Sequence, residues 1–246
     1  MTYIVNDGKT MIADCLVVER NTGTRTLGRL PTLENGYLDL HGQAKGVDVY
    51  YNDCHKIIFH PTATHEGKRI KTMAFAGSVG NVWDLLNALD AGVDLADWFK
   101  VEVNIQPVEE RRLFNGETSM MFTLEDGEIF IARLRGKSID LSNMRWAHLG
   151  SGIDAVNSAN EFIPNRFKGE NTELTALEAF AIACAHTNNV SRKFDYFIHA
   201  TGEYKQNQEL STKQLKWILA RVQKRMDLTR IYKDIQYANN IWGVKK

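Results

Sequence analysis

The sequence has few cysteines and few prolines, and its three cysteines do not suggest a disulfide framework. Cys15, Cys54 and Cys184 are an odd set among 246 residues, and no two of them have the C-x-x-C spacing. Odd, widely spaced cysteines are typical of reduced thiols in a cytosolic protein. We therefore expect a cytoplasmic protein in which these cysteines are small core residues.

The chain also lacks an excess of either charge, a long apolar run and a phosphate-binding loop. Thirty basic residues balance thirty acidic ones, which disfavours nucleic acid and anionic membranes as partners. No run of about eighteen apolar residues predicts a membrane span, and the first ten residues do not resemble a secretion signal. No GxxxxGK[ST] loop occurs. We predict no cofactor, no metal, no nucleic acid partner and no membrane association.

The sequence does have enough apolar residues, 43%, to form one sizeable core. It also has a regular order of short predicted strands and helices. Two strand–turn–strand patterns occur, one at residues 3–13 around Asp7-Gly8 and one at residues 120–132 around Asp126-Gly127. Apolar spacing predicts strands at 47–51, 56–59, 73–77 and 194–198, and helices at 82–89, 154–162, from Thr172 or Thr175, and from Leu210. This order predicts an α+β domain with sheets packed face to face beneath outer helices.

Three local patterns have competing interpretations. The histidines at 55, 60 and 65, with Asp53 and Glu66 nearby, fit a strand followed by a loop better than a zinc site. Cys15 is an alternative thiol nucleophile, although no feature of the sequence predicts a lowered thiol pKa there. The basic residues of the last helix are typical of a solvated face, with a docking surface for an acidic partner as the alternative; they are Lys213, Lys216, Arg221, Lys224 and Arg225.

Several short motifs, taken in order, resemble the proteasome β-subunit family, including its HslV-like members. The resemblance extends over residues 2–200, and the order and spacing of the motifs carry it. The motifs are Thr2-Tyr3-Ile4-Val5, Ile12-Ala13-Asp14, Lys56-Ile57-Ile58, Phe75-Ala76-Gly77, Leu149-Gly150-Ser151-Gly152 and Thr172-Glu173-Leu174-Thr175. The resemblance implies a four-layer αββα sandwich of the N-terminal-nucleophile (Ntn) hydrolase type over residues 1–200, with residues 201–246 as a helical extension packed on it.

The same resemblance implies a catalytic group. Thr2, exposed by removal of Met1, would supply a hydroxyl nucleophile and a free α-amine, whose ordinary pKa of about 7.7 to 8.0 suits it to accept the hydroxyl proton. Lys56 would lower the pKa of that hydroxyl, Asp14 would hold the lysine, and Ser151 would hydrogen-bond near the amine.

The supporting residues implied by the resemblance include two departures from the family pattern. The backbone N–H of Ala74, or of its neighbour, would hold the oxyanion, although the family usually has glycine there. Asn188 occupies the position of a frequent aspartate, and Ser191 keeps the accompanying serine. The long second helix of the family is expected to be shortened between Val93 and Thr118.

The leading hypothesis is a threonine-type Ntn amide hydrolase, most specifically a peptidase acting on peptides or proteins. The alternative is a noncatalytic proteasome-like subunit, or an assembly or binding protein that reuses the fold. The resemblance implies a homo-oligomer, with a ring as one arrangement that the family uses. No motif in the sequence identifies an ATP-driven unfoldase partner.

Overall fold

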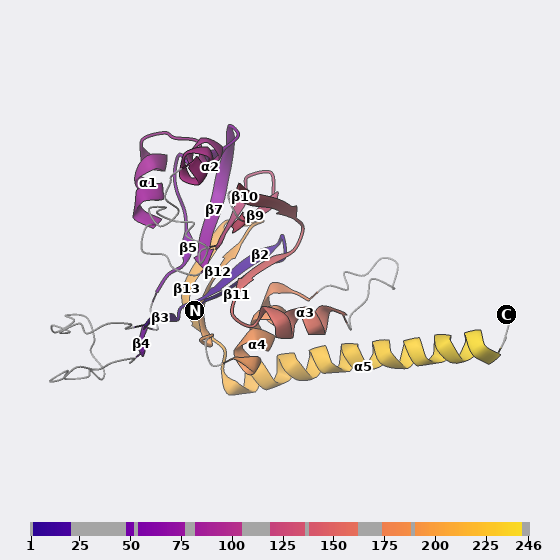
Figure 1. Ribbon diagram of the computed structural model, residues 1–246. Coiled ribbons are helices and arrows are strands. Elements are labelled where there is room, and N and C mark those ends of the chain that lie inside the picture. The colour runs from indigo at the N-terminus through magenta and orange to yellow at the C-terminus, as the bar shows by residue number, and fades with distance from the viewer. Residues whose placement is uncertain are drawn as a thin grey trace.

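The computed structural model describes residues 2–20, 48–51, 54–76, 82–104, 119–135, 138–161, 174–187 and 190–242. In these residues the chain is an α+β protein built on two antiparallel sheets, with helices at opposite ends of the stack (Figure 1). A separate two-stranded ribbon pairs β3 (Val17–Arg20) with β4 (Asp48–Tyr51).

The first sheet contains the beginning of the chain. Its strand order is β11-β1-β2-β12-β13. The bounds are β1 Tyr3–Asn6, β2 Thr10–Asp14, β11 Ala147–Gly150, β12 Lys193–Ile198 and β13 Glu203–Glu209. The turn from β1 to β2 forms because Gly8 adopts a φ of 80° and Asp7 Oδ1 accepts the backbone N–H groups of Lys9 and Thr10 at 2.9 and 2.8 Å.

The second sheet has the order β10-β9-β8-β7-β5, with the short strand β6 also pairing with β7. Its bounds are β5 Ile57–Ile58, β6 Thr64–His65, β7 Lys68–Ala76, β8 Ser119–Leu124, β9 Ile129–Arg135 and β10 Ser138–Met144. Because alternate side chains of a strand point to opposite faces, each sheet has two apolar faces to bury.

One apolar cluster lies between the two sheets. It combines Ile4, Met11 and Ala13 of the first sheet with Ile57, Ala74 and Met121 of the second. All of these side chains are at most 4% exposed. The sheets therefore pack face to face through small and medium-sized residues.

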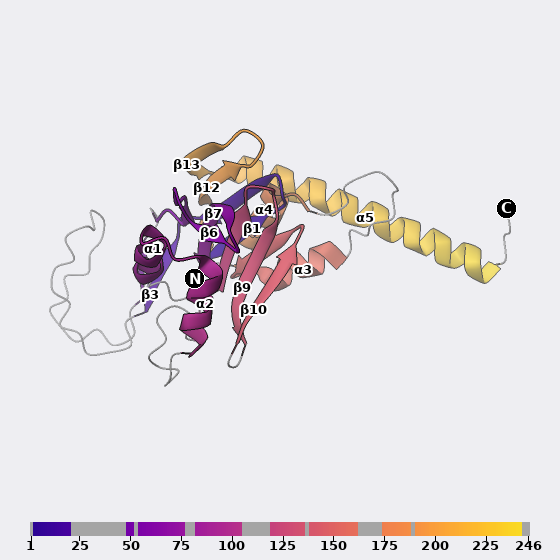
Figure 2. The same cartoon turned by 90° about the horizontal axis from the view of Figure 1, so that it is seen from above.

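The outer face of each sheet is covered by helices (Figures 1 and 2). On the first sheet, α3 (Ile153–Glu161), α4 (Ala176–His186) and α5 (Thr212–Trp242) enclose a cluster centred on Phe180. On the second sheet, α1 (Val82–Asp90) and α2 (Leu95–Asn104) pack over Phe122 and Met73. The far end of α5 projects beyond the sheets, as both views show.

A buried carboxylate fastens α5 to α4. Thr175 caps α4 and forms a capping box with Glu178, whose side chain is 2% exposed. Glu178 also accepts hydrogen bonds from Arg221 at 3.0 Å and from Arg225 at 2.7 Å. These two arginines of the basic face therefore neutralise a buried charge, while their side chains stay 53% and 30% exposed.

The two predicted hairpins and the predicted helices at 82–89, 154–162, Thr175 and the C-terminal segment are confirmed. The sequence analysis did not predict the strands β3, β6, β10, β11 and β13. β13, with the sequence EYKQNQE, is an edge strand with mostly exposed side chains, so it carries no apolar alternation. Thr172, the other start predicted for the helix that begins after Thr175, lies outside the described residues.

No helix in the described segments is both long enough and apolar enough to cross a membrane.

Candidate active site

The carboxylate of Asp14 is the centre of a buried polar group at the end of β2. Its Oδ1 accepts the ammonium of Lys56 at 2.7 Å and the backbone N–H of Tyr3 at 2.8 Å. Its Oδ2 accepts the backbone N–H groups of Leu16 at 3.2 Å and Ser191 at 3.4 Å. Asp14 is 0% exposed, and these four donors compensate for its loss of hydration.

Thr2 directly precedes β1 and is 7% exposed. Its carbonyl oxygen accepts the backbone N–H of Ser151 at 2.7 Å. Gly150 makes this contact possible, since it has a φ of 96° and a Cβ there would lie 1.7 Å from Thr2 O. The peptide unit that joins Thr2 to Tyr3 is therefore held at both ends: Ser151 N–H binds its carbonyl oxygen, and Asp14 Oδ1 binds its N–H.

Lys56 enters the group from the segment just before β5. It is 9% exposed and donates to the carbonyl oxygen of Leu16 as well as to Asp14. Burial lowers the pKa of the Lys56 ammonium and raises the pKa of the Asp14 carboxyl, and the opposite charge of each partner offsets part of that change.

Of the other residues that the resemblance implies, only Ser191 contacts Asp14 in the described part of the chain. Ser191 contributes its backbone N–H to Asp14, while its hydroxyl accepts from Lys193 N at 2.9 Å. Ala74 lies inside β7 with its side chain fully buried between the sheets, and it pairs with Ile57, the residue after Lys56. Asn188 and Met1 lie outside the described residues.

The three histidines weighed as a zinc site lie in three different environments. His55 contacts Asp195, His60 Nε2 lies 3.1 Å from Asp90 Oδ1, and His65 packs among Phe99, Phe122 and Phe130. Among the described residues, no group of three or more His, Cys, Asp or Glu side chains is arranged to hold a metal ion.

Cys15, the alternative nucleophile, is fully buried. Burial, together with the nearby carboxylate of Asp195, raises the pKa of its thiol to about 12. A thiol that stays protonated at neutral pH is a poor nucleophile. This environment favours the interpretation of Cys15 as a core residue.

Sequence reasoning missed Asp195, a second buried carboxylate one strand away from Asp14. Asp195 is 0% exposed and lies in β12, where it pairs with Ala13. Its oxygens accept from His55 Nδ1 at 2.7 Å, Asn207 N at 2.8 Å and the Tyr204 hydroxyl at 3.1 Å. The sequence signal that could have revealed it is an acidic residue inside the apolar run Phe194-Asp195-Tyr196-Phe197-Ile198, since a charge in a buried strand needs partners.

Neither a protein-family model nor a curated protein matches the chain. Among solved structures, it is similar to BPH from Thiobacillus denitrificans in complex with epoxomicin, with 14% identity and a TM-score of 0.44 over 85% of this chain and 98% of that one. It is also similar to an Anbu (Gly-1) mutant from Hyphomicrobium sp. strain MC1, with 13% identity and a TM-score of 0.48 over 96% of this chain and 100% of that one. These likenesses are too remote to assign a function.

Proposed function

We propose that this chain is a threonine-type N-terminal-nucleophile amide hydrolase, most specifically a peptidase, which acts through Thr2 after removal of Met1. One observation carries the proposal: the Lys56 ammonium and the N–H of Tyr3, the residue after Thr2, donate to the same oxygen, Asp14 Oδ1. A buried lysine–carboxylate pair therefore lies beside the peptide bond that Thr2 forms. This is where the chemistry of an N-terminal threonine needs a fixed cation.

The reaction would proceed in two stages. The Thr2 hydroxyl oxygen attacks the carbonyl carbon of the scissile amide while the Thr2 α-amine accepts the hydroxyl proton. A backbone N–H, for which that of Ala74 or its neighbour is the candidate, stabilises the resulting oxyanion. The protonated α-amine then donates its proton to the leaving nitrogen as the C–N bond breaks. Water, deprotonated by the same amine, hydrolyses the ester and restores the threonine.

Lys56 and Asp14 have separate roles in this scheme. The ammonium, held by Asp14 Oδ1 and Leu16 O, lowers the pKa of a nearby hydroxyl by stabilising its anion. Asp14 orients the lysine and the Tyr3 peptide together. The Ser151 N–H holds the Thr2 carbonyl and so limits rotation of the nucleophile, which favours a productive geometry.

The finer architecture belongs to the same proposal. Helices α1 and α2 on one sheet, and α3 to α5 on the other, support the four-layer αββα order. We propose that residues 1–200 form the Ntn-type domain and that residues 201–246 form an extension packed on it through α5. The strand β13 of this extension pairs with β12 and so adds an edge strand to the first sheet of the domain. Self-association and a peptide or protein substrate are part of the proposal.

The test is the intact mass of the purified protein after incubation with a peptide epoxyketone, which captures an N-terminal threonine through both its hydroxyl and its amine. The expected result is loss of Met1 and one adduct, present in wild type and absent in Thr2→Ala. Thr62→Ala is the matched control, since Thr62 is exposed and lies outside the Asp14 group.

A noncatalytic subunit is the second candidate, and two observations favour it. Thr2 is only 7% exposed, and the Ala74 methyl group fills the core beside Ile57. The same mass spectra separate the two candidates. A processed protein that forms no adduct would favour the noncatalytic function, as would an adduct that persists in Thr2→Ala.

A further inference from the structure

His55 and Lys56 are consecutive residues that bind two different buried carboxylates. Lys56 binds Asp14 at the end of β2, and His55 Nδ1 lies 2.7 Å from Oδ2 of Asp195 in β12. The two strands are hydrogen-bonded neighbours, with Ala13 opposite Asp195. The His55–Lys56 segment is therefore attached to two adjacent strands of the first sheet.

The two carboxylates point to opposite faces of that sheet. Ala13, which pairs with Asp195, belongs to the cluster between the sheets, whereas Ile12 belongs to the cluster beneath the helices. Asp14 has the same parity as Ile12, so its side chain leaves the strand on the other face from that of Ala13 and Asp195. Two contacts in different directions hold a short segment more firmly than one.

The Asp195 side chain has donors on both oxygens. Asn207 N and Cys15 Sγ donate to Oδ1 at 2.8 and 3.6 Å, and the Tyr204 hydroxyl donates to Oδ2. Among these described partners, His55 is the only basic side chain. The side chain of Asp195 is 1% exposed and that of His55 is 38% exposed, so the buried carboxylate orients a histidine at the surface.

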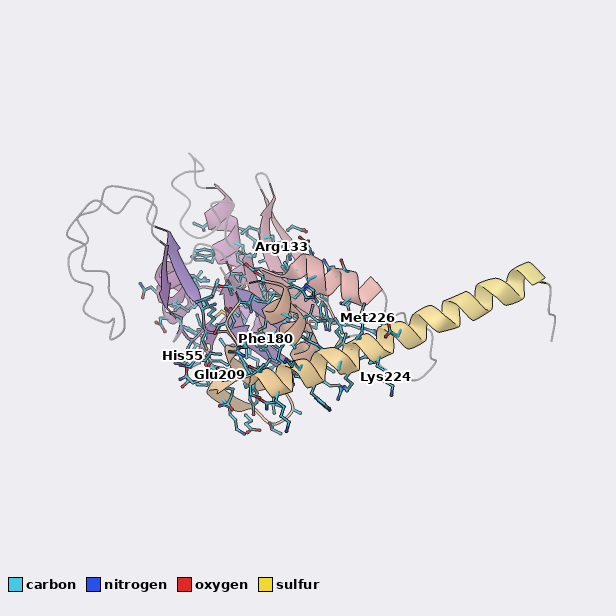
Figure 3. All side chains as sticks on the ribbon, turned by 90° about the horizontal axis from the view of Figure 1, so that it is seen from below. His55, Arg133, Phe180, Glu209, Lys224 and Met226 are labelled. Carbon is cyan, nitrogen blue, oxygen red and sulfur yellow. The ribbon has the colours of Figure 1, made fainter. Side chains whose placement is uncertain are left out.

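The position of His55 fits an anchoring role rather than contact with the reacting atoms. Figure 3 shows His55 at the margin of the packed body, on the side away from the projecting end of α5. Its Nδ1 is engaged by Asp195, and the chain continues directly into Lys56 and β5. A shift of the histidine would be transmitted to the lysine through a single peptide unit.

We propose that His55 and Asp195 form a positioning pair that holds Lys56 against Asp14 and thereby sets the reactivity of Thr2. The effect on Thr2 rests on the proposed function, whereas the effect on Lys56 does not. His55 is a positioning residue in this scheme, and its imidazole takes no part in bond making. Loss of its contact with Asp195 displaces the lysine without removing it.

The experiment compares His55→Asn with His55→Gln in the full-length protein. Both carry the same amide, but Asn places its NH₂ near the position of Nδ1, and Gln places it one methylene further out. His186→Ala, at the exposed end of α4, is the control. Thermal unfolding establishes that each variant is folded, and His55→Ala and Asp195→Asn extend the series if they fold.

The first readout is the rate of inactivation by the peptide epoxyketone, separated into the maximal rate and the half-saturating concentration. A displaced catalytic group costs up to about a hundredfold, so we expect the maximal rate to fall about tenfold or more in His55→Gln. We expect His55→Asn to stay within about threefold of wild type, and the half-saturating concentration to change little. A merely stabilising histidine would leave the maximal rate of both folded variants unchanged, which would overturn the proposal.

The second readout is the rate at which an acetylating reagent modifies Lys56, followed by peptide mass spectrometry. Lys56 is 9% exposed in the wild type, and Lys100, whose side chain is 74% exposed, is the internal reference. We expect faster modification of Lys56 in His55→Gln, with Lys100 unchanged. If the wild type forms no epoxyketone adduct but Lys56 still becomes accessible, the proposed function fails and the positioning pair stands. Unchanged Lys56 modification would overturn the pair.

Discussion

The backbone N–H of Ser151 donates to the carbonyl oxygen of Thr2 over 2.7 Å, and Gly150 brings the two backbones together. Tyr3 pairs with Gly150 in the register of β1 and β11, so this contact continues the sheet up to the candidate nucleophile. A residue that needs a defined geometry for attack is thus held by main-chain atoms, which move less than side chains.

Gly150→Ala tests this contact. The new Cβ would lie 1.7 Å from Thr2 O, and the φ of 96° is itself strained for alanine. We expect a loss of about 3 kcal/mol or more in the free energy of unfolding, measured with urea, and loss of the epoxyketone adduct. Gly127→Ala is the matched control, because Gly127 has a similar φ of 91° but a Cβ added there would meet no atom within 4 Å beyond its chain neighbours. It should cost about 1 to 2 kcal/mol and keep the adduct. Equal losses in both variants would contradict the role of the close approach.

Lys56→Met tests the buried pair. Removing one partner of a buried ion pair typically costs about 3 to 5 kcal/mol, and Asp14 would then be buried without its cation. Lys56 opposes the rise in the Asp14 pKa that burial causes, so in the variant the folded pKa of this carboxyl lies further above its unfolded value, and stability should fall as the pH rises from the unfolded to the folded pKa. We expect a larger loss at pH 8 than at pH 5 in urea unfolding. Lys68→Met, which removes two exposed ion pairs with Asp126 and Glu128, should change the stability little at either pH. A pH-independent loss in Lys56→Met would argue against this explanation.

His199 predicts an acid sensitivity of the fold. Burial lowers its pKa to about 4, and its Nδ1 has no hydrogen-bond partner in the described chain. Between the ordinary pKa of about 6.5 and a folded pKa near 4, the unfolded chain binds a proton that the folded chain does not, so stability falls as the pH drops through this window. Replacement by Gln removes this titration, and the loss of Tm between pH 6.5 and 4 should become shallower. An unchanged slope would contradict the prediction, with His186→Gln as the exposed control.

Glu178→Gln tests how α5 is fastened. Gln can still close the capping box of α4, so the variant chiefly removes the charge that Arg221 and Arg225 neutralise. We expect a loss of about 1 to 3 kcal/mol, and earlier protease cleavage within α5 than in wild type. Glu203→Gln, at an exposed pair with Lys205, should leave both measurements unchanged. Cleavage of α5 at the wild-type rate would show that apolar contacts such as Ile218 and Val222 suffice.

Local signals predicted much of the chain. Asp7-Gly8 and Asp126-Gly127 marked the two hairpins, and Thr175 was one of two starts predicted for α4, because turns and caps depend on residues close in sequence. The strand β13 escaped prediction because edge strands need no apolar alternation. Asp195 also escaped, since a single carboxylate in an apolar run does not reveal which donors surround it.

The sequence by itself determined the composition, the hairpin turns, the helical faces and the candidacy of Thr2, Asp14, Lys56 and Ser151 through a family resemblance. Only the tertiary structure decided that Lys56, 42 positions from Asp14, donates to the oxygen that also accepts the Tyr3 N–H. It likewise decided that His55 is held by Asp195, 140 positions away. The physical reason is that periodicity and turn chemistry act over a few residues. Contacts between strands depend instead on sheet order and on how the two sheets pack, which no short segment specifies.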